Sequence, residues 1–491
     1  MKLTRESLKN KDWQEKGFIL PKFDIEKITK NTKENSAWIH FGAGNIFRAF
    51  PALSMQKLIE DGLSNSGIIL VDRTPKPFKR FENLTLAVTL KSNGDILKNI
   101  VASMVESTSL QEDSKYILEL GKKESLQIIS LTITEKGYNS DETSVPSFIE
   151  LMLYERFLAN KTPIAIVSMD NLANNGDILK NLIFERAKFL DAPKEFLQYL
   201  EKEVSFPITM IDKITPYPSN EVAKILAKDG YEDIEIIKNV ASFVNAEEAQ
   251  YLIIEDIFPN GKPLLEKAGI LFTNRETVKN IEKMKVGACL NPLHTIIAIF
   301  GSLLKIDFVY EAMKNKAIVN LIKECGYNES LPFVPDPIII NPKAFLDEVL
   351  EKRFPNPFIP DSPKRIATDT SLKIPVRFGE VLKTMQTKKK DISELSAIPF
   401  FIAGWFKYLC KIDDEANQLE LSPDPNLQEL TSIFEYTKLG NELPIDAISL
   451  LRRSDIFGIN IIALAPKIKT YFDEMNREKG AIQNTLNKYW A

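Results

Sequence analysis

The first half of this 491-residue chain alternates short β-rich runs with longer amphipathic segments. The β-rich runs, which predict strands, are residues 37–41, 68–71, 126–134, 165–169 and 251–256. The segments with apolar residues at helical spacing are residues 45–62, 145–160 and 177–190. Because strands that alternate with helices need crossover connections, this order predicts a parallel, doubly wound α/β sheet.

The rest of the chain departs from this alternation in two places. Residues 86–103 contain two β-like runs around "SNGD", which predicts a hairpin inserted in the sheet or added to it. After about residue 275, long apolar-periodic segments indicate a mostly α-helical half, in which residues 337–340 ("PIII") are the main strand-like exception. We therefore expect two domains, residues 1–280 and residues 281–491.

Charge and cysteine content narrow the class of protein. A net charge of −4 offers no basic surface for nucleic acid or anionic lipid. Three scattered cysteines and two histidines suit neither a disulfide framework nor a His-rich metal centre, and we expect no metal. Residues 286–304 are about long enough to cross a membrane, but their Asn, His, Pro and Thr favour a helix buried in a large domain. The N-terminal residues lack the apolar stretch of a secretory signal, so we expect a soluble, cytoplasmic protein.

The sequence "WIHFGAGNIFRAF" (38–50) places two glycines directly after the first predicted strand and before a helix. Without side chains there, the backbone can turn tightly and approach a pyrophosphate at the start of the helix. The third glycine of the dinucleotide fingerprint is replaced by phenylalanine, so an ordinary strand-to-helix turn is the alternative. The candidate cofactor-binding residues of this loop are Gly42, Ala43, Gly44, Asn45 and Ile46.

The next predicted strand ends in "ILVDR" (69–73). An acidic residue at this position can accept hydrogen bonds from the ribose hydroxyls, so Asp72 favours NAD as the cofactor. Arg73 could instead hold the 2′-phosphate of NADP, which stays open. His40, inside the first strand, is interpreted as a packed residue rather than a catalytic one. Residues 1–280 are therefore predicted to be a Rossmann-like dinucleotide-binding domain.

The stretch "KVGACLNPLH" (285–294) brings a lysine, an asparagine and a histidine into an otherwise apolar segment. If it belonged to one regular helix, Asn291 and His294 would be neighbours on one face, at i and i+3. Lys285 would point about 180° away from His294, whereas Lys283 would lie nearly in line with it. A single-residue π-bulge, or a break at the proline, would turn Lys285 back towards the histidine. The geometry therefore leaves both lysines open.

These residue types suit proton transfer at an alcohol or a carbonyl group. Oxidation of a secondary alcohol needs a base for the hydroxyl proton and hydrogen-bond donors for the developing alkoxide. A lysine in an apolar cleft can exchange protons near neutral pH, and side-chain amides are fixed donors. The alternative is a hydrogen-bonded core histidine and asparagine beside a solvated lysine.

Six motifs in the same order resemble the long-chain polyol (mannitol) dehydrogenase family over most of the chain. They are "HFGAGNIFRAF" (40–50), "SLTITEKGY" (130–138), "VSMDNLANNGD" (167–177), "MIDKITP" (210–216), "EKMKVGACLNPLH" (282–294) and "RIATDTSLKIPVRFGE" (365–380). The resemblance implies zinc-independent hydride transfer with a lysine as general acid and base. In the family this lysine follows a glutamate by three positions, which selects Lys285 after Glu282. The resemblance further implies that Asn171 and Asn291 form the oxyanion hole and that His294 positions the substrate.

One spacing departs from the family pattern. The catalytic lysine lies six positions before the asparagine, one more than in the family, so the helix needs a bulge there. Asp212, Arg365 and Lys373 match further family positions near the substrate, although Asp212 could equally be a turn carboxylate. Arg377 is an additional candidate cation, and such cations could bind substrate hydroxyls or a carboxylate. Residues 281–491 are therefore predicted to be a mostly helical substrate and catalytic domain.

The motifs at residues 130–138 and 365–380 look closest to the fructuronate reductase branch of the family. This resemblance predicts reduction of D-fructuronate to D-mannonate with NADH. The alternative is a mannitol 2-dehydrogenase or another oxidoreductase of polyols and ketoses, tagaturonate included. A nucleotide-binding sensor without turnover is a further alternative, although the base, both amides and the histidine are all retained. We expect a monomer or a small homo-oligomer.

Overall fold

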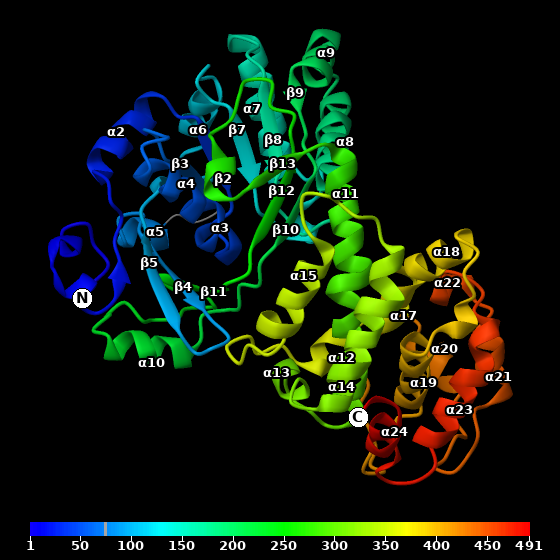
Figure 1. Ribbon diagram of the computed structural model, residues 1–491. Helices are drawn as coiled ribbons and strands as arrows, with labels where there is room; N and C mark the ends of the chain where they lie inside the picture. The colour runs from blue at the N-terminus through cyan, green and yellow to red at the C-terminus, as the bar shows by residue number, and fades with distance from the viewer. Residues whose placement is uncertain (73–75) are drawn as a thin grey trace. The chain divides into compact units, whose positions relative to one another are not determined.

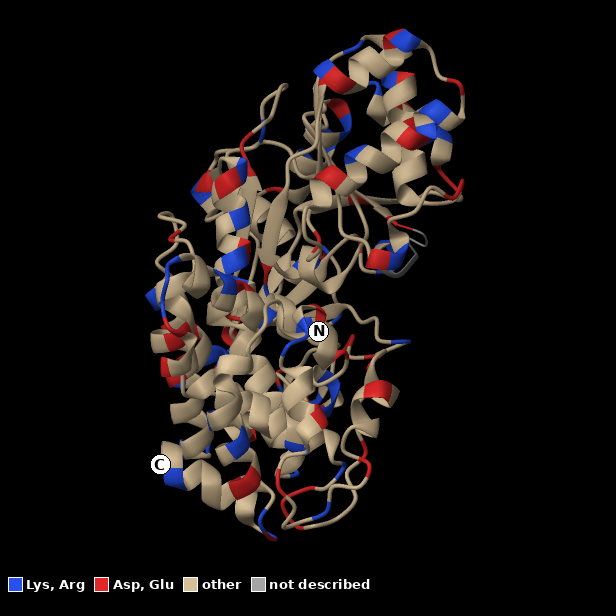
Figure 2. Ribbon diagram, turned by 90° about the vertical axis from the view of Figure 1, so that its right-hand side faces the viewer, with Lys and Arg blue, Asp and Glu red and all other residues tan. Residues whose placement is uncertain are grey.

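The computed structural model describes residues 1–72 and 76–491. These form two compact units, residues 1–278 and 279–491, which we call the N-terminal unit and the C-terminal unit. In the described residues the strands belong to the N-terminal unit, and the C-terminal unit is built from helices (Figure 1). Figure 2 shows Lys and Arg interspersed with Asp and Glu over each unit.

Within the described ranges, the main sheet of the N-terminal unit has six parallel strands in the order β6-β3-β2-β7-β8-β9. The strands are β2 (Trp38–Phe41), β3 (Ile68–Asp72), β6 (Met104–Ser109), β7 (Ile128–Leu131), β8 (Ile164–Ser168) and β9 (Val204–Ser205). The chain runs outward from β2 to β3 and β6, then returns to β7 on the other side of β2. This is the strand order of the Rossmann fold, and it confirms the predicted doubly wound sheet. Such folds bind ligands where the order reverses, here at the carboxyl ends of β2 and β7.

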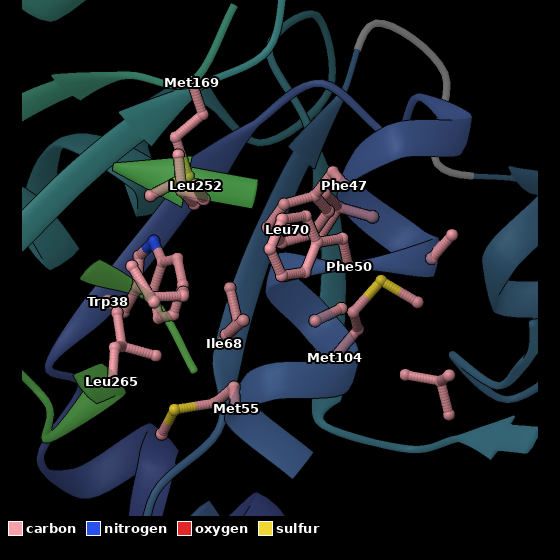
Figure 3. Packing of buried hydrophobic residues seen from close by; sticks show 14 of the residues in the cluster. Trp38, Phe47, Phe50, Met55, Ile68, Leu70, Met104, Met169, Leu252 and Leu265 are labelled. Carbon is pink, nitrogen blue, oxygen red and sulfur yellow. The ribbon is translucent and has the colours of Figure 1, made fainter. Parts of the chain in front are cut away.

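Both faces of this sheet are buried, which explains why its strands read as continuous apolar runs. Trp38 and Leu70 belong to one hydrophobic cluster, together with residues such as Phe47 and Met55 from the helices after β2 (Figure 3). Ile39 alternates with Trp38 along β2 and belongs to a second cluster, which contains residues of α7 and α8. The alternation of side chains along each strand therefore fills two separate layers.

The helices between these strands lie where the sequence predicts them, except that one predicted helix is divided into two. The predicted helix at residues 45–62 is two helices, α3 (Asn45–Ala49) and α4 (Pro51–Glu60), because Pro51 has no N–H and begins a new helix. The predicted helices at residues 145–160 and 177–190 are α7 (Val145–Ala159) and α8 (Asn175–Phe189). The other helices of this unit are α1 (Asp12–Glu15), α2 (Ile25–Glu34), α5 (Lys76–Arg80), α6 (Ser114–Gly121), α9 (Lys194–Lys202) and α10 (Asn220–Lys228).

Two smaller sheets accompany the main one. The predicted hairpin is confirmed as β4 (Thr85–Leu90) antiparallel to β5 (Ile96–Val101), and it belongs to a separate sheet with β1 (Phe18–Ile19) and β11 (Phe243–Glu247). The predicted strand at residues 251–256 is β12 (Tyr251–Glu255), which lies outside the parallel sheet. It pairs with β10 (Thr209–Asp212) in antiparallel and with β13 (Leu271–Thr273) in parallel orientation.

The C-terminal unit is helical, as predicted. Helix α11 (Arg275–Met284) begins in the N-terminal unit and passes through a π-helical turn, Lys285–Cys289, into α12 (Asn291–Leu303). The remaining helices are α13 (Val309–Ala312), α14 (Lys316–Lys323), α15 (Pro342–Glu348), α16 (Pro363–Ile366), α17 (Thr370–Ile374), α18 (Glu380–Thr387), α19 (Ala397–Leu409), α20 (Leu427–Ser432), α21 (Ile445–Leu450), α22 (Ser454–Phe457), α23 (Ala465–Met475) and α24 (Ala481–Trp490).

Two apolar segments differ in structure from what their composition alone suggests. Among the described residues, Arg275–Leu303 is the one helical segment long and apolar enough to cross a membrane, but 78% of its most apolar window is buried in the protein. The strand predicted at residues 337–340 is wrong. Those residues are an irregular loop in which Ile338 is 87% exposed at a φ of +68°. A β-rich composition forms no strand where no neighbouring strand offers hydrogen bonds.

Candidate active site

The loops that follow β2 and β7, together with the last residues of β3, line a cavity of about 620 Å³ within the N-terminal unit. Its lining includes Gly42, Ala43, Gly44 and Asp72 from the predicted cofactor-binding residues. Asn45 and Ile46, also predicted, are the first two residues of α3. The cavity therefore lies at the carboxyl ends of β2 and β7, where the strand order of the sheet reverses.

The two glycines of this loop differ in what they do. Gly42 adopts a φ of +102°, and a Cβ there would lie 2.3 Å from the carbonyl oxygen of Thr132, the first residue after β7. Glycine is therefore required at this position by the sheet itself. Gly44 has a φ of −63°, and a Cβ there would meet no atom nearer than 4.0 Å. The open space beside Gly44 lets a pyrophosphate approach the backbone.

Asp72 is the last residue of β3 and lines the same cavity. A carboxylate at the end of the second strand of a Rossmann sheet is placed to accept hydrogen bonds from the ribose hydroxyls of NAD. Arg73, the residue considered for NADP, lies outside the described residues. The glycine turn, the open space beside Gly44 and the carboxylate at the strand end together fit a dinucleotide.

His40 is a packed strand residue, as predicted. Its ring stacks on Phe47 with 3.4 Å between the ring centres, and its two nitrogens lie 2.6 Å from the Ser130 hydroxyl and 3.0 Å from the Thr132 hydroxyl. Complete burial lowers the pKa of His40 well below its usual value, although a hydrogen bond from the ring to the backbone of Gly42 opposes the shift. The ring is therefore neutral and structural.

The segment between β8 and α8 carries Asn171, which is an exposed residue. The preceding residue, Asp170, accepts hydrogen bonds from the Tyr138 hydroxyl at 2.5 Å and from the Ile133 N–H at 2.8 Å. Burial raises the pKa of Asp170 to about 7, although these hydrogen bonds oppose the shift. Through Asp170, the Asn171 segment is tied to the loop after β7.

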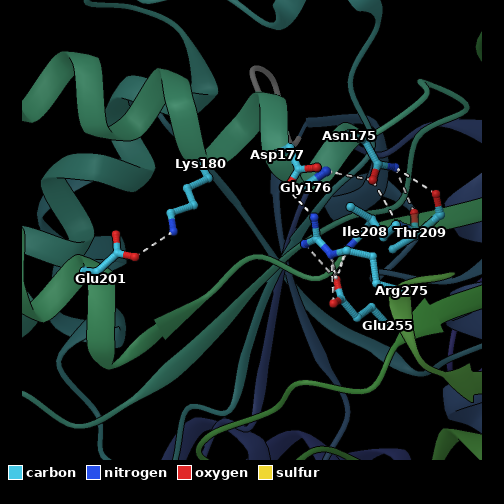
Figure 4. A network of polar contacts seen from close by, with 9 residues as sticks. All are labelled: Asn175, Gly176, Asp177, Lys180, Glu201, Ile208, Thr209, Glu255 and Arg275. Carbon is cyan, nitrogen blue, oxygen red and sulfur yellow. Dashed lines mark hydrogen bonds and ion pairs between the residues drawn. The ribbon is translucent and has the colours of Figure 1, made fainter. Parts of the chain in front are cut away.

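Asn175, the first residue of α8, holds the other end of this segment (Figure 4). Its amide donates to the Asp170 carbonyl at 3.0 Å and to the Thr209 hydroxyl at 2.9 Å, and its oxygen accepts the Thr209 N–H at 3.0 Å. Thr209 begins β10, and the buried residue Asp212 ends it. The network therefore connects the segment of Asn171 to the strand of Asp212, two predicted site residues.

Arg275 extends this network to the start of α11 (Figure 4). Its Nε donates to the two carboxylate oxygens of Glu255 at 2.9 and 3.1 Å, and its terminal nitrogen donates to Asp177 at 2.6 Å. Asp177 lies in the first turn of α8, and Glu255 ends β12. One guanidinium therefore joins α8, β12 and α11 by charge-assisted hydrogen bonds.

Lys285 begins the π-helical turn, and the Leu290 N–H donates to its carbonyl at 3.1 Å, an i→i+5 bond. A π turn takes up one extra residue, so Lys285 and His294 are separated by about 80° around the helix axis instead of about 180°. The bulge that the family spacing requires is therefore present. Lys285 is 6% exposed, whereas Lys283 is exposed to solvent.

Glu282 lies three residues before Lys285, on the last turn of α11. Burial raises the pKa of Glu282, although the charges of Lys285 and Lys279 oppose the shift. Glu282 is only partly buried, whereas Lys285 is buried. Residues at i and i+3 share one side of a helix, and this spacing suits proton exchange between the two groups.

His294 lies one turn into α12 and contacts one acidic and one aromatic residue. Its Nε2 lies 3.1 Å from Oδ2 of Asp361, and its ring stacks on Phe354 at 5.3 Å between the ring centres. Burial lowers the pKa of His294, although the hydrogen bond and charge of Asp361 oppose the shift. The imidazole is therefore neutral near neutral pH.

Arg377 fastens the first turn of α12. Its guanidinium donates to the Thr295 hydroxyl at 2.5 Å and to the Asn291 carbonyl at 3.3 Å. Burial lowers the pKa of Arg377 to about 10, so the group stays charged. Within the described part of the chain, the Asn291 side-chain amide has no hydrogen-bond partner, which leaves its N–H groups available for a ligand.

The two other predicted cations also contact protein groups. The Arg365 side chain is 70% exposed, and its guanidinium pairs with the Asp361 carboxylate, with 2.9 Å from Nε to Oδ1. Lys373 donates to the carbonyl of Ile366 at 3.0 Å and to that of Thr368. Burial lowers the pKa of Lys373, and the positive charges of Arg377 and Arg365 lower it further. The charges of Arg377 and Arg365 therefore both act on Lys373.

The sequence of residues 36–267 matches the mannitol dehydrogenase Rossmann domain, and that of residues 277–474 matches the mannitol dehydrogenase C-terminal domain. The chain is also 41% identical to the D-mannonate oxidoreductase of Thermotoga maritima, over 99% of both chains. The chain belongs to the mannitol dehydrogenase family. The predicted family resemblance is thereby confirmed.

Two solved structures of sugar-alcohol dehydrogenases share the fold of this chain. A D-sorbitol dehydrogenase in substrate-free form superimposes with a TM-score of 0.83 at 25% identity, over 98% of this chain and 99% of that one. The mannitol 2-dehydrogenase of Pseudomonas fluorescens, solved as a ternary complex with NAD and D-mannitol, gives a TM-score of 0.71 at 22% identity, over 99% of both chains. This chain therefore shares its Rossmann sheet and following helical unit with both of these proteins.

Two acidic residues near the predicted site were missed by sequence reasoning. Asp361 precedes Arg365 by four positions, the spacing at which opposite charges pair along a helix, and this signal was present in the sequence. Asp170 directly precedes Asn171, but nothing in the local sequence indicates its bond to Tyr138, 32 residues earlier. Such contacts arise from the tertiary fold.

Proposed function

We propose that this protein is an NAD-dependent oxidoreductase that interconverts D-fructuronate and D-mannonate. The observation that carries the proposal is the 41% identity to a D-mannonate oxidoreductase over 99% of both chains. A hexuronate differs from a polyol by its carboxylate. Arg365, Lys373 and Arg377 offer charge and hydrogen-bond donors suited to that group.

We assign proton transfer to Lys285. When a ketone is reduced, its oxygen gains negative charge and needs a proton, which a lysine ammonium can supply. The burial of Lys285 and the exposure of Lys283 favour the former as this acid. Glu282, partly buried and three residues earlier, is the group that exchanges the proton with solvent.

We assign stabilisation of the negative charge that develops on the carbonyl oxygen to side-chain amides. The Asn291 amide is available as a donor, and an amide stabilises an oxyanion without a change in its own charge. Asn171, which the family resemblance places in the same role, belongs to the N-terminal unit, and its role stays a prediction. Asp212 stays a predicted substrate contact for the same reason.

The cofactor residues in this proposal are those of the cavity in the N-terminal unit. The backbone of Gly42, Ala43 and Gly44 faces the pyrophosphate, and Asn45 and Ile46 begin the helix that follows. Asp72 accepts hydrogen bonds from the ribose hydroxyls. NAD, when bound, supplies the hydride acceptor or donor. We further propose a cytoplasmic protein that works as a monomer or a small homo-oligomer.

The test is the absorbance at 340 nm when the purified protein meets NADH and D-fructuronate, with D-fructose in parallel and NADPH as a second cofactor. Oxidation of NADH with D-fructuronate supports the proposal. Oxidation with D-fructose alone would move the activity to polyols and ketoses and leave the carboxylate assignment without support. If neither ketose reacted with either cofactor, the proposal would be wrong.

A further inference from the structure

A carboxylate that the proposed chemistry does not use directly lies against the ring of His294. Oδ2 of Asp361 is 3.1 Å from Nε2 of His294, while Oδ1 of the same carboxylate accepts the Arg365 Nε–H at 2.9 Å. We propose that Asp361 is a positioning residue that fixes the tautomer of His294, so that the histidine receives a substrate hydroxyl as a hydrogen-bond acceptor. This inference rests on the proposed function.

Asp361 is itself held in place from several sides. Its carbonyl accepts the Val309 N–H at 2.9 Å, and its own N–H donates to the Ile359 carbonyl at 2.8 Å. Its side chain is 11% exposed, whereas the Arg365 side chain bonded to it is 70% exposed. Burial alone would raise the pKa of Asp361, but the hydrogen bonds and charges of His294 and Arg365 hold it below its usual value. The group is therefore a fixed anion near neutral pH.

A fixed anion determines which nitrogen of the neutral imidazole carries the proton. A carboxylate only accepts hydrogen bonds, so the nitrogen that faces it, Nε2, must be the N–H of the ring. Nδ1 then has a free lone pair. In the part of the chain that the structure describes, no protein donor reaches Nδ1 of His294, and the ring is held by its stack on Phe354. A ligand group at Nδ1 must be a donor, as a sugar hydroxyl is.

This arrangement makes His294 a specificity determinant. A substrate with a hydroxyl at the contacted carbon satisfies the Nδ1 lone pair, whereas the corresponding deoxy sugar leaves a buried acceptor unpaired. Without Asp361, the ring could carry its proton on Nδ1 instead. It would then offer a donor in place of an acceptor, so the substrate hydroxyl could no longer donate to the ring and its hydrogen bonding would have to rearrange.

The chain contains only two histidines, so ¹⁵N-histidine labelling reads the tautomer directly. We expect the His294 signals of the wild-type protein near pH 7.5 to show a protonated Nε2 and an unprotonated Nδ1, with His294→Gln identifying which signals disappear. In Asp361→Leu the Nδ1–H tautomer should gain population. A wild-type ring protonated at Nδ1, or an unchanged tautomer in Asp361→Leu, would overturn the proposal. The wild-type spectrum alone is sufficient if the variant does not fold.

Kinetics provide the second readout through a double-mutant cycle. Asp361→Leu and His294→Gln should each lower kcat/KM for the reactive ketose by about 10- to 100-fold, because each removes one charge-assisted or buried hydrogen bond. The double variant should be no worse than the worse single variant, since Asp361 acts through His294. Multiplicative losses would refute that dependence.

The matched control is Asp391→Leu, which removes an exposed carboxylate of the same unit that caps the Ser393 N–H at 2.9 Å. It should alter neither the tautomer of His294 nor kcat/KM. The spectrum requires no substrate, so the two proposals fail separately. A wild-type protein with the expected tautomer and no turnover of any ketose would refute the proposed function while supporting the positioning of His294 by Asp361.

Discussion

Replacement of Gly42 by alanine tests whether the turn after β2 is required by the sheet or only by the cofactor. Gly42 adopts a φ of +102°, and the alanine Cβ would lie 2.3 Å from the carbonyl oxygen of Thr132. That oxygen belongs to the backbone directly after β7 and cannot rotate away as a side chain could. The carboxyl ends of β2 and β7 would have to separate.

The magnitude follows from these two effects. A non-glycine residue held in a region of φ and ψ that favours glycine costs about 1–3 kcal/mol. Moving the methyl group to an ordinary contact of about 3.5 Å strains the packing of β2 against β7, at a further cost of about 1–3 kcal/mol. We therefore expect the free energy of unfolding to fall by about 2–6 kcal/mol, which lowers Tm by about 4–12 °C at about 2 °C per kcal/mol.

Thermal unfolding followed by circular dichroism measures this loss, with Gly44→Ala as the matched control. A Cβ at Gly44 meets no atom nearer than 4.0 Å, so Gly44→Ala should keep its Tm within about 2 °C. The same methyl would occupy space beside the loop that a pyrophosphate needs, and NADH titration by fluorescence should show weaker binding. A Gly42→Ala protein with an unchanged Tm would refute the steric argument, and equal losses of Tm in both variants would do the same.

Three further predictions concern single side chains. Lys285→Met should lower kcat by a factor on the order of 10²–10⁴ because it removes the proposed acid, while Lys283→Met, at an exposed position, should keep it, as measured at 340 nm. The raised pKa of Asp170, about 7, means that its stabilising contribution is complete below the usual carboxyl pKa and is lost as the pH rises through about 7. Melting curves from about pH 4 to pH 8 should show a smaller decline in Asp170→Asn than in the wild type, because burial also raises the pKa of Glu150 to about 7. Arg156, fully buried, donates to five backbone carbonyl groups. Lysine has only three donors, so Arg156→Lys should lose about 2–6 kcal/mol in urea unfolding, and a loss below 1 kcal/mol would contradict this account.

Local sequence patterns were sufficient to predict the strands that are buried on both faces. The strands of the parallel sheet are covered on both faces, so β2, β3, β7 and β8 read directly as apolar runs. β12 was also recognised as a strand, but its partner β10 is about 40 residues earlier and runs antiparallel to it. Membership of a sheet depends on such pairing, which periodicity does not contain.

In the candidate site, too, some features were predictable from local sequence and others depended on tertiary contacts. The glycine turn was predictable because its two glycines directly follow an apolar run that predicts a strand, and the Lys285 motif because its polar residues interrupt an apolar segment. The need for a bulge after Lys285 also followed from helix geometry and the family spacing. The partners of these residues could not be predicted from local sequence, because Asp361, for example, contacts His294 from 67 positions later in the chain.

The irregular helices of the C-terminal unit are best understood through the groups they carry. Its described residues contain π-helical segments at Lys285–Cys289, Glu324–Ser330, Val349–Arg353 and Pro375–Gly379, although fewer than about 1% of residues in globular proteins are π-helical. The first segment packs against the second and the fourth. It carries Lys285, and the fourth carries Arg377. A widened turn is less stable than a regular α-helix and persists where the surrounding packing and the function require it. The first and fourth segments therefore place Lys285 and Arg377 in neighbouring stretches of helix that have given up regular hydrogen bonding.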